Sequence, residues 1–273
     1  MTRRVDGHMA RKRFGQNFLT DERVIAGIIA AFAPARGQNV VEIGPGLGAL
    51  TRELLGHLGR LHVVELDRDL AAALPLRLMN EGELVVHQSD ALKFDFRTLA
   101  TGPHSLRVIG NLPYNISTPI LFHLLTQSDV IADMTFMLQK EVVERMVAEP
   151  GTGDYGRLSV MLQYRCQVEW LLHVPPEAFS PPPKVDSAVV RLIPYATPRY
   201  TCTDESKLQH LLTTAFNMRR KTLRNAVKGL IPAEWLDEAG IDPGLRPEEV
   251  TVADWVALAN RLATHESTET SPS

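Results

Sequence analysis

The chain contains little cysteine: Cys166 and Cys202 are its two cysteines among 273 residues, and no CxxC pair occurs. This argues against a disulfide scaffold or a structural zinc site and fits a reducing cytosol, so we expect a cytoplasmic protein. The nine histidines are scattered and form no HExxH motif, so we expect no metal centre. No apolar run approaches the ~18 residues that cross a membrane, and the basic N-terminus lacks the apolar core of a secretory signal. We therefore expect no membrane partner.

The overall charge does not predict nucleic-acid binding, because the net charge is −3 and the isoelectric point is about 6.3. The charge is uneven, however, and local basic patches decide phosphate binding. Residues 1–13 carry five basic side chains against Asp6, and residues 219–228 carry five with no acid. The candidate RNA contacts from these segments are Arg11, Lys12, Arg13, Arg219, Arg220, Lys221 and Arg224. The alternative is that both segments are solvated faces.

Apolar, β-branched runs alternate with amphipathic stretches through the first two thirds of the chain. The expected strands are 39–43, 61–66, 84–88, 106–110, 132–139, 167–174 and 187–193, and the expected early helices are 49–58, 69–79 and 117–127. Alternation of this kind predicts βαβ units and a parallel sheet. The last two strands are joined by the proline-rich segment 175–183 without a helix, so we expect an antiparallel strand at one end of the sheet.

Beyond Pro194 no strand pattern returns, and residues 206–264 are predicted to be helical, with Thr251 and Asp254 spaced for a capping box. At 273 residues the chain exceeds one average domain, so one large domain and one small domain are expected. We divide it into a basic segment at 1–20, an α/β domain at 21–195, a helical domain at 204–264 and a disordered, Ser/Thr/Glu-rich tail at 265–273.

The first strand leads into a glycine-rich loop, with Gly44, Gly46 and Gly48 at alternate positions before a helix. Glycines at such a turn let a ligand approach the backbone closely. Glu65 ends the second strand, 21 positions beyond Gly44, where a carboxylate can accept both hydroxyls of a ribose. Because Gly44-x-Gly46-x-x-Ala49 satisfies the dinucleotide fingerprint, these features would equally suit NAD.

Polar groups also follow the next two strands. Asp90 and Ala91 come after the third strand and Asn111 ends the fourth, so four successive carboxyl ends present ligand-binding groups at one edge of the sheet. A second glycine match, GTGDYG at 151–156, follows a helical stretch and Pro150 where the fingerprint requires a strand. We interpret that segment as a mobile loop.

The tetrapeptide Asn111-Leu112-Pro113-Tyr114 supplies what is needed to methylate an exocyclic amine of a base. The amine of adenine is a poor nucleophile because its lone pair is delocalised into the ring. Acceptors for both of its N–H groups draw the nitrogen toward tetrahedral geometry. Here Asn111 offers an amide oxygen, the next two residues offer backbone carbonyls, and Tyr114 offers a flat face for stacking. Pro113 restricts the local backbone, so these groups are held stiffly.

The glycine loop, Glu65, Asp90 and this tetrapeptide, in that order, resemble the S-adenosylmethionine (SAM)-dependent methyltransferases that act on base amines. Further segments narrow the resemblance to the rRNA adenine N6,N6-dimethyltransferases, and within them to the bacterial small-subunit (16S), or kasugamycin-resistance, family. These segments are ARKRFGQNFL at 10–19, GNLPYNIS at 110–117, LQKEVVERMVA at 138–148, AFSPPPKVDSAVVRL at 178–192, AFNMRRKTLRN at 215–225 and GIDPGLRPEEVT at 240–251. The resemblance covers about residues 8–262.

The resemblance implies a Rossmann-like class I methyltransferase with a seven-stranded, mostly parallel sheet and a small all-α C-terminal domain. Segment 1–20 would cap the SAM site, 21–195 would be the catalytic domain and 204–264 would bind rRNA. The implied cofactor residues are Gln16, Asn17, Leu19, Gly44, Gly46, Glu65, Leu66, Asp90, Ala91 and Asn111. The implied catalytic residues are Asn111, Leu112, Pro113, Tyr114 and Phe179. Tyr114 and Phe179 would sandwich the target adenine, the latter from a rigid, exposed loop before Ser180.

The implied reaction is direct in-line transfer of two methyl groups from SAM to each of two neighbouring adenosines near the 3′ end of small-subunit rRNA. The expected partner is the immature 30S particle, bound by a monomer. Three alternatives stay open from the sequence. The chain could instead be a macrolide-resistance enzyme that modifies large-subunit rRNA, a ribosome-assembly factor with methylation secondary, or an NAD-dependent oxidoreductase suggested by the glycine loop alone.

Overall fold

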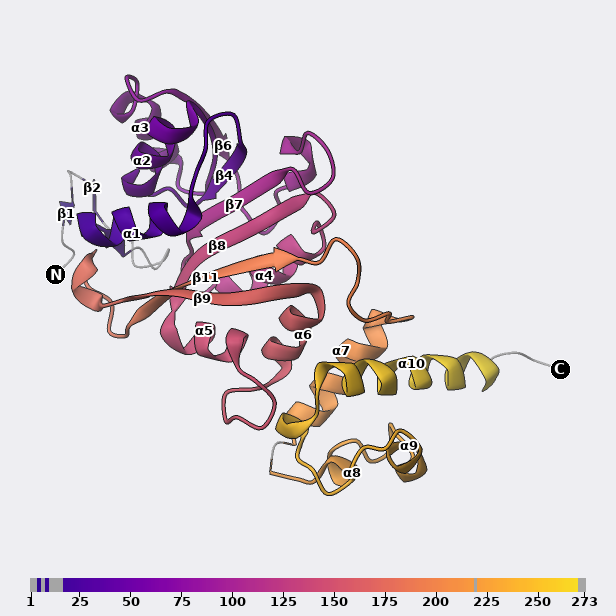
Figure 1. Ribbon diagram of the computed structural model, residues 1–273. Coiled ribbons are helices and arrows are strands. Elements are labelled where there is room, and N and C mark those ends of the chain that lie inside the picture. The colour runs from indigo at the N-terminus through magenta and orange to yellow at the C-terminus, as the bar shows by residue number, and fades with distance from the viewer. Residues whose placement is uncertain (1–3, 6–7, 10–16, 219, 270–273) are drawn as a thin grey trace. The chain divides into compact units, whose positions relative to one another are not determined.

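The computed structural model describes residues 4–5, 8–9, 17–218 and 220–269 (Figure 1). It consists of two compact units. The larger, α/β unit contains the described residues up to Val143 together with Val168–Ala196, and the smaller, helical unit contains Glu144–Gln167 together with the described residues from Thr197 on. The range 195–204 contains the third passage of the chain between the units, after Ala196. Residues 144–167, which the sequence assigned to the α/β domain, belong instead to the helical unit.

The larger unit is built on a seven-stranded sheet. Its strands are β4 (Asn39–Ile43), β5 (Arg60–Glu65), β6 (Glu83–Gln88), β7 (Leu106–Asn111), β8 (Ile131–Gln139), β9 (Cys166–Val174) and β11 (Ser187–Pro194), in the order β6-β5-β4-β7-β8-β11-β9. Strands β4 to β8 pair in parallel, and β11 runs antiparallel to β8. The predicted strands and the antiparallel strand are thereby confirmed, with β11 lying one place inside the edge strand β9.

Two short antiparallel pairs accompany the sheet. Strand β1 (Arg4–Val5) pairs with β2 (His8–Met9), and β3 (Phe18–Leu19) pairs with β10 (Phe179–Ser180). The second pair joins segments 160 positions apart through the register of Leu19 with Phe179. It is extended by the backbone N–H of Thr20, which donates to the carbonyl of Ala178 at 2.8 Å. The chain before the first helix is therefore tied to the segment that precedes β11.

Helices cover both faces of the sheet, with α1, α2 and α3 on one side and α4 on the other (Figure 1). Aspartate side chains begin two of them: Asp21 accepts from the N–H groups of Arg23 and Val24, and Asp67 accepts from those of Asp69 and Leu70. The helices of this part are α1 (Glu22–Phe32), α2 (Ala49–Leu58), α3 (Arg68–Arg77) and α4 (Ser117–Leu125), with 3₁₀ turns η2 (Phe96–Leu99) and η3 (Pro176–Ala178). Helix α5 (Lys140–Val147) begins in this unit and ends in the smaller one.

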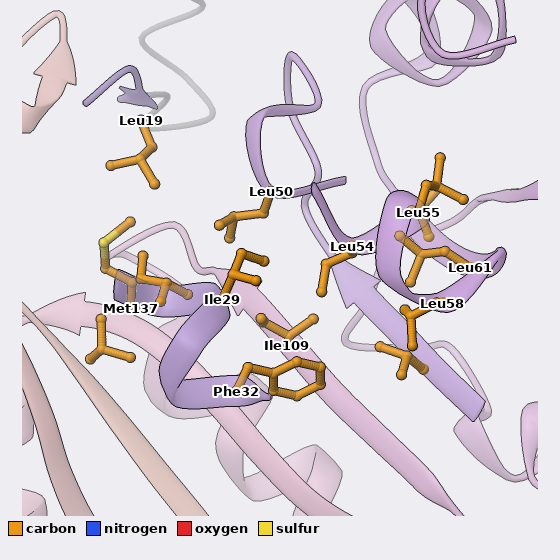
Figure 2. Packing of buried hydrophobic residues seen from close by; sticks show 14 of the residues in the cluster. Leu19, Ile29, Phe32, Leu50, Leu54, Leu55, Leu58, Leu61, Ile109 and Met137 are labelled. Carbon is orange, nitrogen blue, oxygen red and sulfur yellow. The ribbon is translucent and has the colours of Figure 1, made fainter. Parts of the chain in front are cut away.

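The apolar core beneath α1, α2 and α3 is continuous across the sheet (Figure 2). Ile29 and Phe32 of α1 and Leu54 of α2 meet Ile109 of β7 and Met137 of β8, and all five are at least nine-tenths buried. Burial of such side chains stabilises the fold by roughly 1.5–3 kcal/mol each. This packing holds the sheet rigidly, so the strand ends that carry the polar residues have fixed positions.

The smaller unit contains α6 (Arg157–Arg165), α7 (Glu205–Phe216), α8 (Leu223–Ala226), α9 (Ala233–Glu238), the 3₁₀ turn η4 (Pro247–Glu249) and α10 (Val252–Glu269). Its core includes Tyr155 and Trp255, whose rings lie 6.4 Å and 5.8 Å from that of the partly buried Phe216. Thr251 caps α10 by accepting from the N–H of Asp254 at 3.2 Å, as the spacing predicted. In the part of the chain that the structure describes, none of the helices has the length and apolar character needed to cross a membrane.

The structure corrects one expectation for the C-terminus. Helix α10 continues to Glu269, so the disorder predicted for 265–273 is wrong for residues 265–269. Residues 270–273 lie outside the described part of the chain, as do five of the candidate site residues. These are Arg11, Lys12, Arg13, Gln16 and Arg219.

Candidate active site

A cavity of about 340 Å³ lies at the carboxyl edge of the parallel strands, entirely within the larger unit. The ends of β4, β5, β6 and β7 all contribute to it, which is the edge where the sequence predicted a ligand site. Most of the predicted cofactor and catalytic residues line it together. They are Asn17, Leu19, Gly44, Gly46, Glu65, Leu66, Asp90, Ala91, Asn111, Leu112, Pro113 and Tyr114.

The glycine loop after β4 packs closely against the segment that precedes α1. Gly46 has a φ of +58°, and a Cβ atom there would lie 3.3 Å from the ring of Phe18. A side chain at this position would therefore be strained and would also crowd Phe18. The glycine lets the loop backbone come up to the cavity, and Phe18 also lines the cavity.

Glu65 is held by backbone groups from two loops. Its Oε2 accepts from the N–H of Gly46 at 3.2 Å, and its Oε1 accepts from the N–H of Asp67 at 2.8 Å. The residue is only 7% exposed, and burial raises the pKa of its carboxyl, while the two backbone bonds act in the opposite direction. Because an ionised carboxylate has about four acceptor sites, Glu65 retains capacity to accept two ligand hydroxyls.

The neighbouring residues form a surface that fits a purine. Leu66 follows Glu65 and is 47% exposed, which places an apolar side chain at the cavity wall. Asp90 follows β6, and its Oδ1 accepts from the N–H of Leu92 at 3.0 Å. The carboxylate is thereby oriented while its second oxygen can accept from an exocyclic amine. The carboxylate of Glu65, the apolar side chain of Leu66 and the carboxylate of Asp90 therefore all line the cavity at the strand ends.

Asn111 ends β7, and its amide is oriented by the backbone. The Nδ2 group donates to the carbonyl oxygen of Asn17 at 3.3 Å. A carbonyl can only accept, so the amide nitrogen faces Asn17 and Oδ1 is the atom left to act as an acceptor. The loop that follows is also fixed, because the N–H of Leu112 donates to the carbonyl of Met137 at 3.2 Å and that of Ile116 donates to the carbonyl of Pro113 at 3.1 Å.

Tyr114 is half-buried at the cavity wall, and its hydroxyl lies 2.6 Å from Oγ of Ser187. Burial raises the pKa of this phenol, so it stays protonated near neutral pH.

Phe179 does not lie at the cavity beside Tyr114. Its side chain is 3% exposed and packs in the core with Leu19 and Met137, and it is not among the cavity-lining residues. The expectation of an exposed Phe179 is wrong because pairing of β10 with β3 turns its ring into the core.

The lining residues that the sequence analysis did not assign to the site include Glu42 and Phe18. Glu42 is 1% exposed in β4, and burial raises its pKa to about 8, although the hydroxyl of Thr51, which donates to its Oε2 at 2.7 Å, opposes the shift. The nearby Glu65 raises the pKa further. A usable signal existed for Glu42, since it is the one charged residue in the apolar strand NVVEI.

The described basic candidates and the second glycine match belong to the smaller unit. Arg220, Lys221 and Arg224 have exposed side chains, the first two in the turn after α7 and the third in α8. In the loop at 151–156, Tyr155 is fully buried and Gly156 precedes α6, so this segment leads into a helix of the helical unit and does not line the cavity. Across the described ranges, no group of three or more His, Cys, Asp or Glu side chains is arranged to hold a metal ion.

Comparison with known proteins decides the family. A family model described as ribosomal RNA adenine dimethylase matches residues 7–264. The chain belongs to this family. The Ribosomal RNA small subunit methyltransferase A of Alcanivorax borkumensis is 59% identical over 254 residues, which cover 93% of this chain and 90% of that protein.

Two solved structures of rRNA or adenosine methyltransferases share the fold. A dimethyladenosine transferase from Plasmodium falciparum has a TM-score of 0.76 at 27% identity, covering 92% of this chain and 98% of that one. The 23S rRNA methyltransferase ErmE has a TM-score of 0.70 at 29% identity, covering 90% and 100%. The predicted fold class, the methyltransferase activity and the cofactor SAM are thereby confirmed, and the glycine loop serves a methyltransferase and not an NAD-dependent oxidoreductase.

Proposed function

We propose that this chain transfers methyl groups from SAM to the N6 amines of two adjacent adenosines near the 3′ end of small-subunit rRNA. The product would be N6,N6-dimethyladenosine, formed during biogenesis of the small subunit. The observation that carries the proposal is the convergence of the glycine loop, Glu65 and the Asn111–Tyr114 loop on one cavity. The choice of subunit is supported by the 59% identity to a relative named for the small subunit, against 29% to the 23S rRNA enzyme.

The residues at the cavity fit SAM. Glu65 would accept the ribose hydroxyls, Asp90 the adenine amine, and Leu66 would contact the purine face, while Asn17, Leu19, Gly44, Gly46 and Ala91 would enclose the remainder. Gln16 would complete the enclosure from the undescribed segment. When bound, SAM supplies a methyl group on a sulfonium, which is already an activated leaving group. No nucleophile on the protein is therefore required.

The chain's own contribution is to bind and align the amine. Oδ1 of Asn111 would accept one N–H, and the backbone carbonyls of Leu112 and Pro113 offer the second acceptor. These bonds strengthen as the nitrogen becomes tetrahedral, so they favour the transition state over the ground state. Asn111 is not a base, and the alkylated amine loses its proton without one. Catalysis would therefore rest on alignment and hydrogen bonding.

The target adenine must leave its stack to reach this cavity, which costs a few kcal/mol. Tyr114 offers the face on which it would stack. Phe179, proposed as the opposite face, would have to leave its core position to contact the base. Of these two residues, Tyr114 alone offers a face for the proposed stacking in this structure. A role of Phe179 in stacking would require a rearrangement when RNA binds.

Exposed basic side chains would hold the RNA backbone. Arg220, Lys221 and Arg224 present charge from the smaller unit, and Arg11, Lys12, Arg13 and Arg219 would add to it. The proposed substrate is the immature 30S particle, modified in the cytoplasm by a monomer. Residues 204–264, which belong to the smaller unit, would be the main rRNA-binding domain, and segment 1–20 would cap the SAM site.

The deciding experiment incubates the protein with labelled SAM and either unmethylated small subunits, unmethylated large subunits or no RNA, followed by nuclease digestion and mass spectrometry. We expect dimethyladenosine with small subunits alone. Label on the large subunit would assign the chain to the resistance-type enzymes. Transfer to neither subunit by a protein that binds SAM would contradict the proposal and favour a role in assembly.

A further inference from the structure

The hydroxyl of Tyr114 makes a hydrogen bond with a residue that does not line the cavity, Ser187. It lies 2.6 Å from Oγ of Ser187, which is fully buried. The other end of the residue is also held, because Oγ of Ser117 donates to the backbone carbonyl of Tyr114 at 3.1 Å. The aromatic side chain is therefore fixed both at its backbone and at its phenol oxygen.

The topology of the sheet brings Ser187 to this place. It is the first residue of β11, the strand antiparallel to β8, and it pairs in register with Gln139 at the end of β8. An antiparallel strand starts where its parallel neighbours end, so β11 begins at the edge that carries the cavity. Strand β8 lies between β7 and β11, and the Tyr114 side chain therefore reaches past the end of β8 to a strand two places away.

The bond constrains the direction of the tyrosine ring. A short contact between two neutral hydroxyls at a half-buried position satisfies both groups, and leaving either one unpaired there is unfavourable. With the phenol oxygen tied to β11 and the backbone tied to α4 through Ser117, the side chain cannot change its χ1 rotamer without losing a bond. The orientation of the Tyr114 ring face next to the cavity is therefore fixed before a base binds.

We propose that Ser187 is a positioning residue for methyl transfer, because it holds Tyr114 in the orientation on which the target adenine stacks. This rests on the proposed stacking role of Tyr114. The base is thereby directed so that its N6 amine meets the acceptor on Asn111, which ends β7 three residues before Tyr114. Ser187 itself touches neither the cofactor nor the base, since it is not among the cavity-lining residues.

The second methylation depends most on this orientation. Each SAM carries one transferable methyl, so a doubly methylated adenine requires an exchange of cofactor between the two transfers. A base held firmly against Tyr114 outlasts the exchange, whereas a loosely held base departs with one methyl. Loss of the hydroxyl contact should therefore raise the share of monomethyladenosine as well as weaken productive binding.

The test compares Ser187→Ala, Tyr114→Phe and the double variant in methylation of unmethylated small subunits, with kcat, KM and the mono- to dimethyl ratio measured. Each single variant removes the same bond from one side and should lower kcat/KM about fivefold to tenfold and raise the monomethyl share. The double variant should be no worse than either single one, because the interaction is already lost. Affinity for SAM should be unchanged in all three.

Thr135→Val is the matched control. Thr135 is a 1% exposed residue on β8 whose hydroxyl has no hydrogen-bond partner among the described residues, so its loss should leave the product ratio unchanged. Additive effects in the double variant, or a wild-type product ratio in both single variants, would overturn the inference. If Ser187→Ala does not fold, Tyr114→Phe still tests the bond. Full activity in Tyr114→Ala would instead contradict the stacking role on which the inference rests.

Discussion

Asn111 and Glu65 lie on one cavity, but different backbone groups orient them. The carbonyl of Asn17 turns the Asn111 amide so that its oxygen can accept, whereas the N–H groups of Gly46 and Asp67 hold the Glu65 carboxylate. An acceptor aimed at a reacting amine and a carboxylate aimed at a ribose should fail in different ways when removed. The proposed roles, a catalytic acceptor for Asn111 and a cofactor ligand for Glu65, therefore predict different effects of substitution.

Asn111→Ala should lower kcat by about 10²-fold or more, because it removes a bond that strengthens in the transition state, while the Kd for SAM changes by less than about tenfold. Glu65→Ala should show the reverse pattern and weaken SAM binding first. Calorimetric titration of SAM and single-turnover methylation give the two quantities. Glu53→Ala, an exposed carboxyl on α2, is the control and should alter neither. A large loss of SAM affinity in Asn111→Ala would make this residue chiefly a cofactor ligand.

Glu42 should make the stability of the SAM-free protein depend on pH. Its pKa is raised by burial to about 8 in the folded chain, so the folded state holds a proton that the unfolded state releases above its ordinary value of 4.5. The proton-linked stability is complete below pH 4.5 and is lost as pH rises toward 8. Glu42→Gln keeps the acceptor for Thr51 and cannot ionise. Its stability relative to wild type should therefore rise between pH 5 and pH 8, by on the order of a few kcal/mol.

Thermal or urea unfolding of the two proteins at pH 5, 6.5 and 8 measures this difference. Other titrating groups are common to both chains and cancel in the comparison. Thr51→Val, which removes the hydroxyl that donates to Glu42, should move the pKa of Glu42 still higher and extend the pH range over which stability is lost. A constant difference between wild type and Glu42→Gln at all three pH values would show that Glu42 is ionised throughout.

Single residues were predictable where a motif fixes their chemistry, and less so where packing decides. Glu65, Asp90 and Asn111 could be predicted from their positions at the carboxyl ends of strands, where open α/β sheets bind their ligands. The prediction that Phe179 is exposed was wrong. An aromatic residue close to three consecutive prolines is typical of an exposed loop, and the local sequence does not show that Phe179 pairs with the distant Leu19. Glu42 was overlooked because its burial depends on α2, whose Thr51 makes a carboxyl tolerable inside the sheet.

At the scale of elements, β7 approaches β4 so closely that one position admits only glycine. A Cβ atom on Gly110 would lie 2.5 Å from the carbonyl oxygen of Ile43, and strands in a parallel sheet cannot separate locally without losing ladder bonds. Gly56 in α2 is the opposite case, because a Cβ atom there would meet nothing within 4 Å. Gly110 is therefore needed for the close packing of β7 against β4, whereas position 56 in α2 has room for a side chain.

Gly110→Ala should destabilise the larger unit by about 2 kcal/mol or more, because β4 and β7 must shift to relieve the contact. Since Asn111 follows directly, methyl transfer should fall as well. Gly56→Ala, the matched control, should stabilise by roughly 0.5–1 kcal/mol, because alanine is the better helix former. Thermal unfolding followed by circular dichroism gives both values. Equal melting temperatures for the two variants would contradict the packing argument.

The seven strands of the large sheet were predicted within a residue or two at each end, because runs such as those at 39–43 and 106–110 are apolar and bounded by breakers. The short strands β1, β2, β3 and β10 were not predicted. Helices α1 and α6 were not predicted. Helix α6 follows a glycine-rich loop that suggests irregular structure, and its burial comes from distant helices of the smaller unit. Local pattern identifies an element when its apolar face is clear, and tertiary packing decides the remainder.

At the scale of the whole molecule, the chain passes between its two units more than once. Residues 144–167 leave the α/β unit, join the helical unit and return as β9, which no local signal marks. The sequence did reveal that basic charge is concentrated in two short segments of an otherwise acidic protein. A net charge of −3 gives no general attraction for RNA, so any such attraction must come from local basic patches, for which those segments are the candidates.

Arg220→Ala with Lys221→Ala should therefore weaken binding to small subunits and reduce its dependence on salt. Each phosphate contact releases counterions, so losing two should lower the slope of log K against log salt by about 1 to 2. The control is Arg52→Ala with Arg60→Ala, which changes net charge equally but removes residues paired with Glu81 and Glu83 on the larger unit. Binding measured from 50 to 300 mM salt separates the two effects. If the control shifts the slope as much as the test variant, net charge and not a basic surface drives association. If neither shifts it, the contacts with rRNA lie elsewhere, and the segment 219–228 is a solvated face.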